Sequence, residues 1–264
     1  MPINIPMTYK QYGQVPFFYV NGLGISNDAT TPNSLLDIAI GTCIDSTETF
    51  QMELLTPCVI NSAINGFNGL DTGTIADSKI YAVYLISDPV SANPTGAMIS
   101  LNYLSFNGLA PVMPFGYSAY NLIGFVATNS GGHFLPGYWT SGNAGLRTFY
   151  YDAPQATAVT AGAATAYTAV NLSTLVPLGI NRNVWIYSSY VPNAAGHQLS
   201  MQPEVGTGAP IVITGQVAAT AVTSQSKLTS SLVTGTPNVQ EINYKVGNAS
   251  DTVAIDVLGY EFYI

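Results

Sequence analysis

The sequence predicts an all-β protein made of two β-sandwich, jelly-roll-like units that follow an extended N-terminal arm. Three observations predict this fold: apolar residues recurring at a spacing of two, turn-forming pairs at short intervals, and few helix signals. The predicted parts are the arm at 1–24, a first β domain at 25–140 and a C-terminal β-sandwich at 141–264.

The arm is expected because its first residues combine prolines with exposed apolar side chains. Pro2, Pro6 and Pro16 favour an extended chain and discourage further strand pairing at its edge. A solvated tail should not leave so much apolar surface in water, so we expect the arm to contact a neighbouring subunit or a larger particle. Its predicted contact residues are Ile3, Ile5, Met7, Tyr9, Tyr12, Phe17, Phe18 and Tyr19.

The strands are predicted from runs of β-branched and aromatic residues. Segments 79–87 and 121–128 are apolar on both faces, which is typical of central strands. Segment 239–246 alternates between apolar and polar residues, which indicates a half-exposed strand. The remaining runs that predict strands are 184–191, 210–222 and 252–264.

Residues 45–55 carry the clearest helix signal. Asp45 and Glu48 stand at capping-box spacing, so this segment is expected to form either one short helix or a strand. Elsewhere no long amphipathic pattern is present in the sequence.

The stretch NGFNGLDTG, residues 65–73, raises the question of a phosphate-binding loop. Such a loop needs a helix after its glycines and usually a lysine that meets the phosphates. Here a strong strand pattern follows, and Lys79 comes too late. Asn and Gly tolerate positive φ, so the stretch is predicted to be a tight structural corner. Its turn residues are Asn65, Gly66, Asn68, Gly69, Asp71 and Gly73.

Composition excludes several classes of partner. Only 8% of the residues are charged, the formal net charge is −8, and no basic cluster occurs, so nucleic acid is excluded as a partner. The longest apolar runs are too short to span a bilayer, so no membrane insertion is expected. The first residues lack the basic start and apolar stretch of a signal peptide. A surface built from Asn, Ser, Thr, Gln, Gly and Tyr fits a rigid assembly better than a freely diffusing enzyme.

No residue pattern predicts catalysis, a cofactor or a metal site. His133 and His197 have no carboxylate or cysteine at ligand spacing and are expected in turns or on the surface. A nucleophile elbow is absent from the sequence. Cys43 and Cys58 either pair or remain two buried free thiols, and the lack of a cysteine framework favours the thiols.

The chain contains 17 tyrosines, several of them in short aromatic runs such as 137–139, 149–153 and 259–264. Most are expected to be core and edge residues of the sandwiches. Some are alternatively expected to form a subunit interface or a sugar-contacting platform, since tyrosine combines a large apolar area with a polar tip.

Three motifs in order resemble a module of tailed-bacteriophage virion proteins, described as tail-fibre-like or as virion structural proteins. They are Leu23 to Asp28, Gly69 to Gly73, and Pro114 to Gly124, and the resemblance covers about residues 20–140. The relatives often carry basic residues before the Ile-Gly pair, where this chain has Ala119 to Leu122, so an assembly contact made there must differ.

The resemblance implies a non-enzymatic structural component of a phage virion, displayed as a capsid decoration, cement or fibre subunit. The alternative is a receptor-binding adhesin of the tail that contacts a host surface glycan or protein. A glycan-cleaving tailspike is disfavoured, because it needs paired carboxylates. We expect a homotrimer, a symmetry taken from the resemblance, that also contacts major capsid or tail proteins. The C-terminal carboxylates show no evident pairing; they are Asp152, Glu204, Glu241, Asp251, Asp256 and Glu261.

Overall fold

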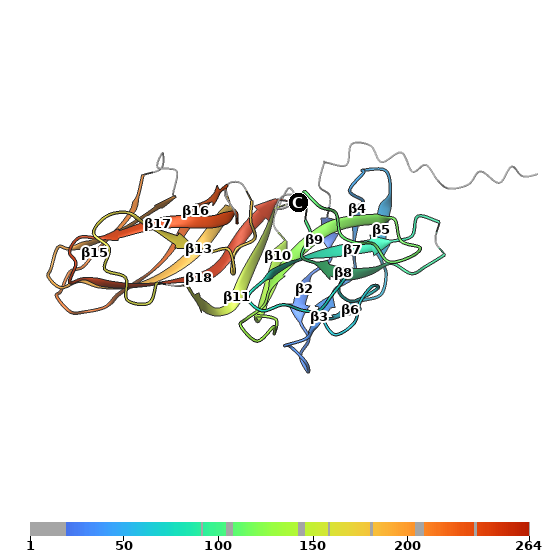
Figure 1. The fold of residues 1–264 in the computed structure, drawn as a ribbon, viewed down its shortest axis with the longest axis horizontal. Coiled ribbons are helices and arrows are strands. Elements are labelled where there is room, and N and C mark those ends of the chain that lie inside the picture. Colours follow the sequence, from blue (N-terminus) through green and yellow to red (C-terminus); the bar gives the residue numbers. More distant parts are fainter. Residues whose placement is uncertain are drawn as a thin grey trace, which may run out of the picture.

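A computed structural model of the chain confirms the all-β prediction. Every regular element in the described residues is a β-strand, and Figure 1 shows two β-rich halves joined end to end in an elongated body. No helix able to cross a membrane occurs in this part of the chain. The structure describes residues 20–90, 92–103, 108–141, 146–157, 159–179, 182–203, 209–234 and 237–263.

The N-terminal half contains two three-stranded sheets and the first part of a longer sheet. One small sheet has the order β1-β4-β5 and the other the order β8-β7-β9. All eight residues of β7 are buried, as the two-sided apolar pattern of this segment predicts. The strands of this half are β1 (Val20–Gly22), β2 (Ile25–Asn27), β3 (Leu35–Ile38), β4 (Gly41–Ile44), β5 (Gln51–Leu54), β6 (Cys58–Asn61), β7 (Ile80–Ser87), β8 (Gly96–Ser100) and β9 (Ala119–Ala127).

The C-terminal half is a β-sandwich with alternating side chains. In β13, Val184, Ile186 and Tyr190 are buried, whereas Trp185 and Tyr187 between them are partly exposed. This spacing of two places one row in the core and the other on the outer face. The strands from the middle of the chain onward are β10 (Gly137–Ser141), β11 (Leu146–Ala156), β12 (Thr168–Asn171), β13 (Arg182–Val191), β14 (Gln198–Pro203), β15 (Ile211–Thr214), β16 (Val222–Val233), β17 (Val239–Val246) and β18 (Thr252–Tyr263).

One 12-stranded antiparallel sheet connects the two halves. Its order is β15-β14-β17-β16-β13-β18-β11-β10-β2-β3-β6, and β12 pairs with β17 beside this path. The expected boundary near residue 140 falls within β10, which pairs with β2 on one side and β11 on the other. The apolar side chains of both halves belong to one continuous core. The outer face of the long sheet therefore runs across the middle of the molecule (Figure 1).

Residues 45–55 form a turn and the strand β5 instead of a helix. The Asp45 carboxylate accepts hydrogen bonds from the backbone amides of Thr49 and Phe50 at 2.8 and 2.7 Å. These bonds close a turn rather than cap a helix. Glu48 has a φ of 60°, which an α-helix does not admit.

The predicted arm lies almost wholly outside the described residues, including all of its predicted contact side chains. Its last residues, 20–24, belong to the folded body. Val20 to Gly22 form β1 against β4, and Leu23 is fully buried.

The stretch 65–73 forms turns between β6 and β7. Gly66, Asn68 and Gly73 have φ values of 91°, 57° and 80°, the left-handed region that Gly and Asn tolerate. The Asn68 side chain accepts a hydrogen bond from the Ala97 amide at 3.0 Å and so ties this corner to β8. Asp71 accepts a hydrogen bond from the Ser100 hydroxyl at 2.6 Å.

Candidate functional site

Three aromatic side chains, Tyr138, Tyr150 and Trp185, form a row on the outer face of the long sheet; we call them the aromatic row. Tyr138 on β10 pairs in register with Tyr150 on β11, which pairs with Gly259 on β18. Gly259 in turn pairs with Trp185 on β13, whose other partner is Lys227 on β16. Directly paired residues share one face of a sheet, so all of these side chains emerge on the same side.

The rings of the aromatic row touch one another across the glycine. The ring centroids of Tyr138 and Tyr150 are 5.6 Å apart, and those of Tyr150 and Trp185 are 6.3 Å apart. Gly259 has no side chain to separate Tyr150 from Trp185, although β18 lies between their strands. The row remains accessible, since Tyr138 is 48% exposed and the other two rings are partly exposed.

A second set of rings fixes the aromatic row from beneath. Each strand alternates its side chains between the two faces of the sheet. The residues next in sequence to Tyr138, Tyr150 and Gly259 therefore point into the core; they are Trp139, Phe149 and Tyr260, and all three are buried. The Trp139 ring lies 5.0 Å from Phe149 and 5.7 Å from Tyr260, centroid to centroid. The Trp139 indole N–H also donates to the Phe125 carbonyl oxygen at 3.1 Å. These packed rings leave the strands under the row little freedom to move.

Polar groups border the aromatic row on its β16 side. The Lys227 ammonium lies 2.6 Å from a carboxylate oxygen of Glu261 and 5.4 Å from the Trp185 ring centroid. The Asn183 amide donates to the same carboxylate at 3.1 Å, and Thr229 donates to Asn183 at 3.2 Å. The positive charge at this end of the row is therefore matched by a nearly buried carboxylate.

A hollow borders the aromatic row on the opposite side. Its volume is about 480 Å³, and Tyr138 and Trp139 of β10 lie along one side of it, although the Trp139 ring itself is buried in the core. The floor of the hollow is formed by residues paired in sequence from strand to strand. Tyr138 pairs with Ser26 on β2, Ser26 with Asp37 on β3, and Asp37 with Val59 on β6. The Asp37 carboxylate makes no hydrogen bond to another described residue, so its oxygens are open to a ligand. The hollow thus places the Tyr138 ring beside the Asp37 carboxylate, whose oxygens can accept hydrogen bonds from a ligand.

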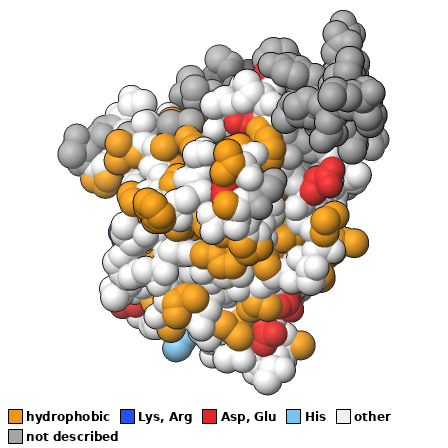
Figure 2. All heavy atoms as spheres, turned by 90° about the vertical axis from the view of Figure 1, so that its right-hand side faces the viewer, with side chains coloured by type: hydrophobic (Ala, Val, Ile, Leu, Met, Phe, Trp, Pro, Cys, Tyr) orange, Lys and Arg blue, Asp and Glu red, His pale blue; other side chains and the backbone are white. Residues whose placement is uncertain are grey.

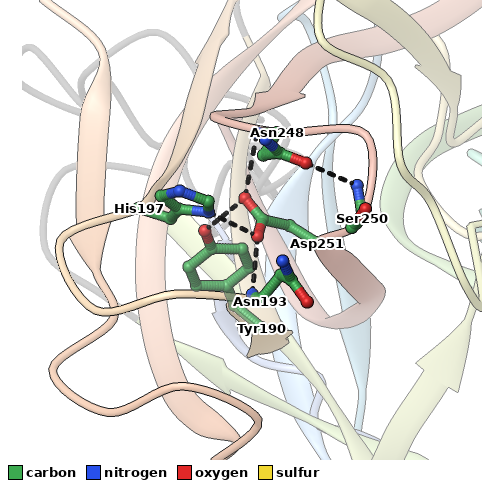
Figure 3. Close-up of polar contacts among 6 residues, drawn as sticks. All are labelled: Tyr190, Asn193, His197, Asn248, Ser250 and Asp251. Carbon is green, nitrogen blue, oxygen red and sulfur yellow. Dashed lines mark hydrogen bonds and ion pairs between the residues drawn. The ribbon is translucent and has the colours of Figure 1, made fainter.

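A polar network surrounds Asp251, which is fully buried (Figure 3). Its carboxylate accepts hydrogen bonds from the backbone N–H groups of Asn193 and Asn248 at 2.7 and 3.0 Å. The Tyr190 hydroxyl donates to it at 3.0 Å, and His197 Nδ1 lies 2.8 Å from Oδ1. These partners come from β13, from the loop after it, and from the β17–β18 turn. Asp251 therefore holds this end of the sandwich together.

The donors around Asp251 also fix its charge state. Burial alone would raise its pKa, but the hydrogen bonds from Asn193, His197 and Tyr190 outweigh burial, and the pKa is lowered. No Ser, Thr or Cys side chain among the described residues bonds to His197, so this His-Asp pair is not arranged as a nucleophile triad.

We expect the lowered pKa of Asp251 to contribute to stability above the unfolded-state pKa of about 3.9. That contribution is present at neutral pH and is lost as the pH falls through the native pKa. Urea unfolding from about pH 7 to about pH 2 should show this loss, and Asp251→Asn should remove it from the pH profile. Asp152→Asn, at an exposed position, is the matched control. An unchanged profile in Asp251→Asn would contradict the assignment.

His133 is exposed within a turn, and His197 lies in the loop between β13 and β14, as expected. What the sequence interpretation missed is the contact of the His197 ring with Asp251. Its partner is distant in sequence, so no local spacing could have indicated the pair. None of Asp152, Glu241, Asp256 and Glu261 lines the hollow beside the aromatic row, and Glu204 lies outside the described residues. No group of three metal-binding side chains occurs in the described parts of the chain.

Cys43 and Cys58 do not form a disulfide; Cys43 is buried, and Cys58 is partly exposed. Burial raises the pKa of Cys43 to about 12 and that of Cys58 to about 11. Because the thiolate is the reactive form, we expect both to react far more slowly with a disulfide reagent than a free thiol does at about pH 8. Both should react fully in concentrated guanidinium chloride. Rapid labelling of the Cys58→Ser variant would show that Cys43 is accessible after all.

Comparison with known proteins identifies no family. No protein-family model matches the chain, and no curated protein matches it. Among solved structures, it is similar to a carbohydrate-binding module from Cellvibrio mixtus lichenase 5A in complex with cellotriose. The identity is 15%, the TM-score is 0.24, and 47% of this chain and 86% of that chain are covered.

Two other similar structures cover most of this chain. For exo-beta-1,3-galactanase from Phanerochaete chrysosporium the identity is 10% and the TM-score 0.23, with 89% of this chain and 67% of that chain covered. For infectious bursal disease virus, Gx strain, the identity is 11% and the TM-score 0.23, with coverages of 93% and 69%. At such TM-scores the similarity carries no argument about function.

Proposed function

We propose that this chain is a non-enzymatic structural component of a bacteriophage particle, displayed on the virion as a decoration, cement or fibre subunit. The observation that carries the proposal is a set of exposed apolar side chains on three loops of the N-terminal half. These segments, 64–73, 88–90 with 92–95, and 108–118, are called the apolar loops. Their large exposed apolar residues are Ile64 at 46%, Val90 at 81%, Leu109 at 53%, Val112 at 51% and Phe115 at 104%.

The apolar loops support one another. Tyr117 stacks on Phe67 with a centroid distance of 5.4 Å, and its hydroxyl donates to the Pro94 carbonyl at 3.0 Å. The Val112 amide donates to the Asp71 carboxylate at 3.2 Å. Figure 2 views the N-terminal half end-on and shows apolar side chains over much of this face, with acidic ones beside them. A fixed apolar surface suits docking onto another protein of an assembly.

The motifs that resemble phage virion proteins build the frame that carries these loops. Leu23 to Asp28 contains β2, Gly69 to Gly73 lies in the first apolar loop, and Pro114 to Gly124 leads from the third loop into β9. Gly124 is needed for packing, because a Cβ there would meet Ile25 and the Trp139 ring. The motifs therefore describe a scaffold rather than a catalytic site, which supports a structural role.

Antibodies against the purified chain, applied to sedimented phage particles, test the proposal. We expect labelling of tailed particles and co-sedimentation of the chain with the major capsid protein. Quantitative mass spectrometry of the same particles gives the copy number, which is in the hundreds for a decoration and a handful for a fibre or tail tip. Detection only in unassembled host extract would overturn the proposal.

Substitution of Phe115 by Asp tests the docking surface, with Tyr167→Asp on the C-terminal half as control. The Phe115 variant should fold but incorporate poorly into particles. Sedimentation of the free chain tests the proposed homotrimer in parallel, because a monomeric mass at all concentrations would exclude it. Normal incorporation of Phe115→Asp would place the docking surface elsewhere.

A further inference from the structure

We propose that the aromatic row and the adjoining hollow bind a neutral oligosaccharide. This inference goes beyond the proposed structural role and does not depend on it. The site lies on the outer face of β13, β18, β11, β10, β2 and β3, at the middle of the long sheet. It is distinct from the apolar loops of the N-terminal half.

The first argument is the chemistry of the rings. Sugar rings present C–H groups on their faces and hydroxyl groups on their edges, so a binding site needs flat apolar surfaces and polar groups beside them. Tyr138, Tyr150 and Trp185 supply three contiguous rings, and the two tyrosines add hydroxyl groups that donate and accept hydrogen bonds. The packed layer of Trp139, Phe149 and Tyr260 below makes this surface rigid before any ligand binds.

The second argument is the placement of polar groups. Asp37 in the hollow offers carboxylate oxygens without a described partner, and such oxygens accept hydrogen bonds from neighbouring hydroxyl groups. Ser26 lies between Asp37 and Tyr138 in the register, and its side chain is exposed. Thr140, two residues after Tyr138, is exposed on the same face. Groups that donate or accept hydrogen bonds therefore lie next to Tyr138 both across the sheet, at Ser26 and Asp37, and along β10, at Thr140.

The third argument is charge. The ammonium group of Lys227, at one end of the row, forms an ion pair with Glu261, which offsets its attraction for an acidic sugar. Asp37 and the net charge of −8 also disfavour an anionic ligand. A neutral oligosaccharide is the class that meets no repulsion at this face.

The surroundings of the row favour a sugar over a protein. The residues next to Trp185 and Tyr187 on the neighbouring strand are Lys227 and Gln225, and Asn183 precedes Trp185 on its face. Val59 on β6 is the large exposed aliphatic residue of the hollow, whereas others of the described N-terminal half, such as Val90, lie on the loops. A protein interface would be expected to join aliphatic and aromatic groups in one patch.

The test is binding of the full-length protein to chitohexaose, maltohexaose and laminarihexaose, and to a printed array of neutral bacterial surface oligosaccharides. The chain has two tryptophans, one in the row and one directly beneath it, so intrinsic fluorescence reports occupancy. Calorimetry confirms the stoichiometry. We expect saturable binding to at least one neutral probe, with little dependence on salt concentration.

Tyr138→Ala is expected to weaken that binding about tenfold, as is Trp185→Ala. Tyr138 is about half exposed, so its replacement should change the unfolding midpoint little, and the midpoint is measured for each variant. Tyr167→Ala, at an exposed tyrosine on the C-terminal half, is the matched control and should bind as the unmodified protein does.

Several results would overturn the inference. They are no saturable binding to any neutral probe, binding that neither Tyr138→Ala nor Trp185→Ala weakens, and binding only to charged oligosaccharides that salt abolishes. Binding of a protein partner through the row without any glycan binding would overturn it as well. Each of these results leaves the particle-labelling test of the proposed function unaffected, so the two proposals fail separately.

Discussion

Replacing Asp251 by Ala is expected to lower the free energy of unfolding by about 3 to 5 kcal/mol. The carboxylate is fully buried and accepts hydrogen bonds from the backbone N–H groups of Asn193 and Asn248 and from the Tyr190 hydroxyl. His197 Nδ1 lies 2.8 Å from the carboxylate. Removing it would leave these donors without an acceptor at a site with little access to water. A buried donor left without an acceptor costs more free energy than the hydrogen bond contributed, and several donors lose their acceptor at once in this variant.

Equilibrium urea unfolding, followed by tryptophan fluorescence, measures this effect. Tyr190→Phe removes one donor while leaving the carboxylate in place and should cost only about 1 kcal/mol. Asp152→Ala changes an exposed carboxylate and should lie within about 0.5 kcal/mol of the unmodified protein. If Asp251→Ala resembled Asp152→Ala, the network would not be holding the two loops together.

The strands were the part of this fold most open to prediction. Segment 239–246 alternates between apolar and polar residues, and segment 79–87 is a short run that is apolar on both faces. Both are local strand signals, and the structure has β17 and β7 there. Residues 45–55 show the limit of local signals. The Asp45 carboxylate, which could cap a helix, instead accepts hydrogen bonds from the Thr49 and Phe50 backbone amides and closes a turn, a choice that local spacing did not indicate.

The sites were less open to prediction because they depend on contacts between distant residues. His197 and Asp251 meet only because β13, β14, β17 and β18 bring their loops to one end of the sandwich. The aromatic runs of the sequence left core positions and an exposed contact surface open, and they did not indicate which rings face outward. Which tyrosines face outward depends on the register, and β18 shifts register against both β11 and β13 next to Gly259.

Gly259 is the position where a single methyl group is expected to disrupt both the sheet and the aromatic row. Its φ is not in the left-handed region, so the requirement for glycine comes from space and not from backbone conformation. A Cβ at this position would overlap the Phe149 carbonyl oxygen and lie 3.1 Å from the Tyr150 Cα. Both are backbone atoms of β11, which cannot move aside as the end of a flexible side chain can.

Gly259→Ala is therefore expected to lower the free energy of unfolding by about 3 kcal/mol, the upper end of the usual cost of overpacking. Gly24→Ala is the matched control, because a Cβ there would meet only Ala39 Cβ at an ordinary 3.8 Å. Its effect should stay within about 1 kcal/mol, since alanine also restricts the unfolded chain. Urea unfolding measures both variants.

The same substitution should alter the aromatic row, since β18 separates the strands of Tyr150 and Trp185. Displacing β11 from β18 would move the Tyr150 ring away from Trp185, whose centroid now lies 6.3 Å from it. We expect a changed near-ultraviolet circular dichroism spectrum in Gly259→Ala under conditions where the variant is still folded, and no such change in Gly24→Ala. A Gly259→Ala protein with unaltered stability and spectrum would mean that the backbone of β11 shifts to accommodate the methyl group. The short distance between Gly259 and the β11 backbone would then not be what keeps the Tyr150 and Trp185 rings in contact.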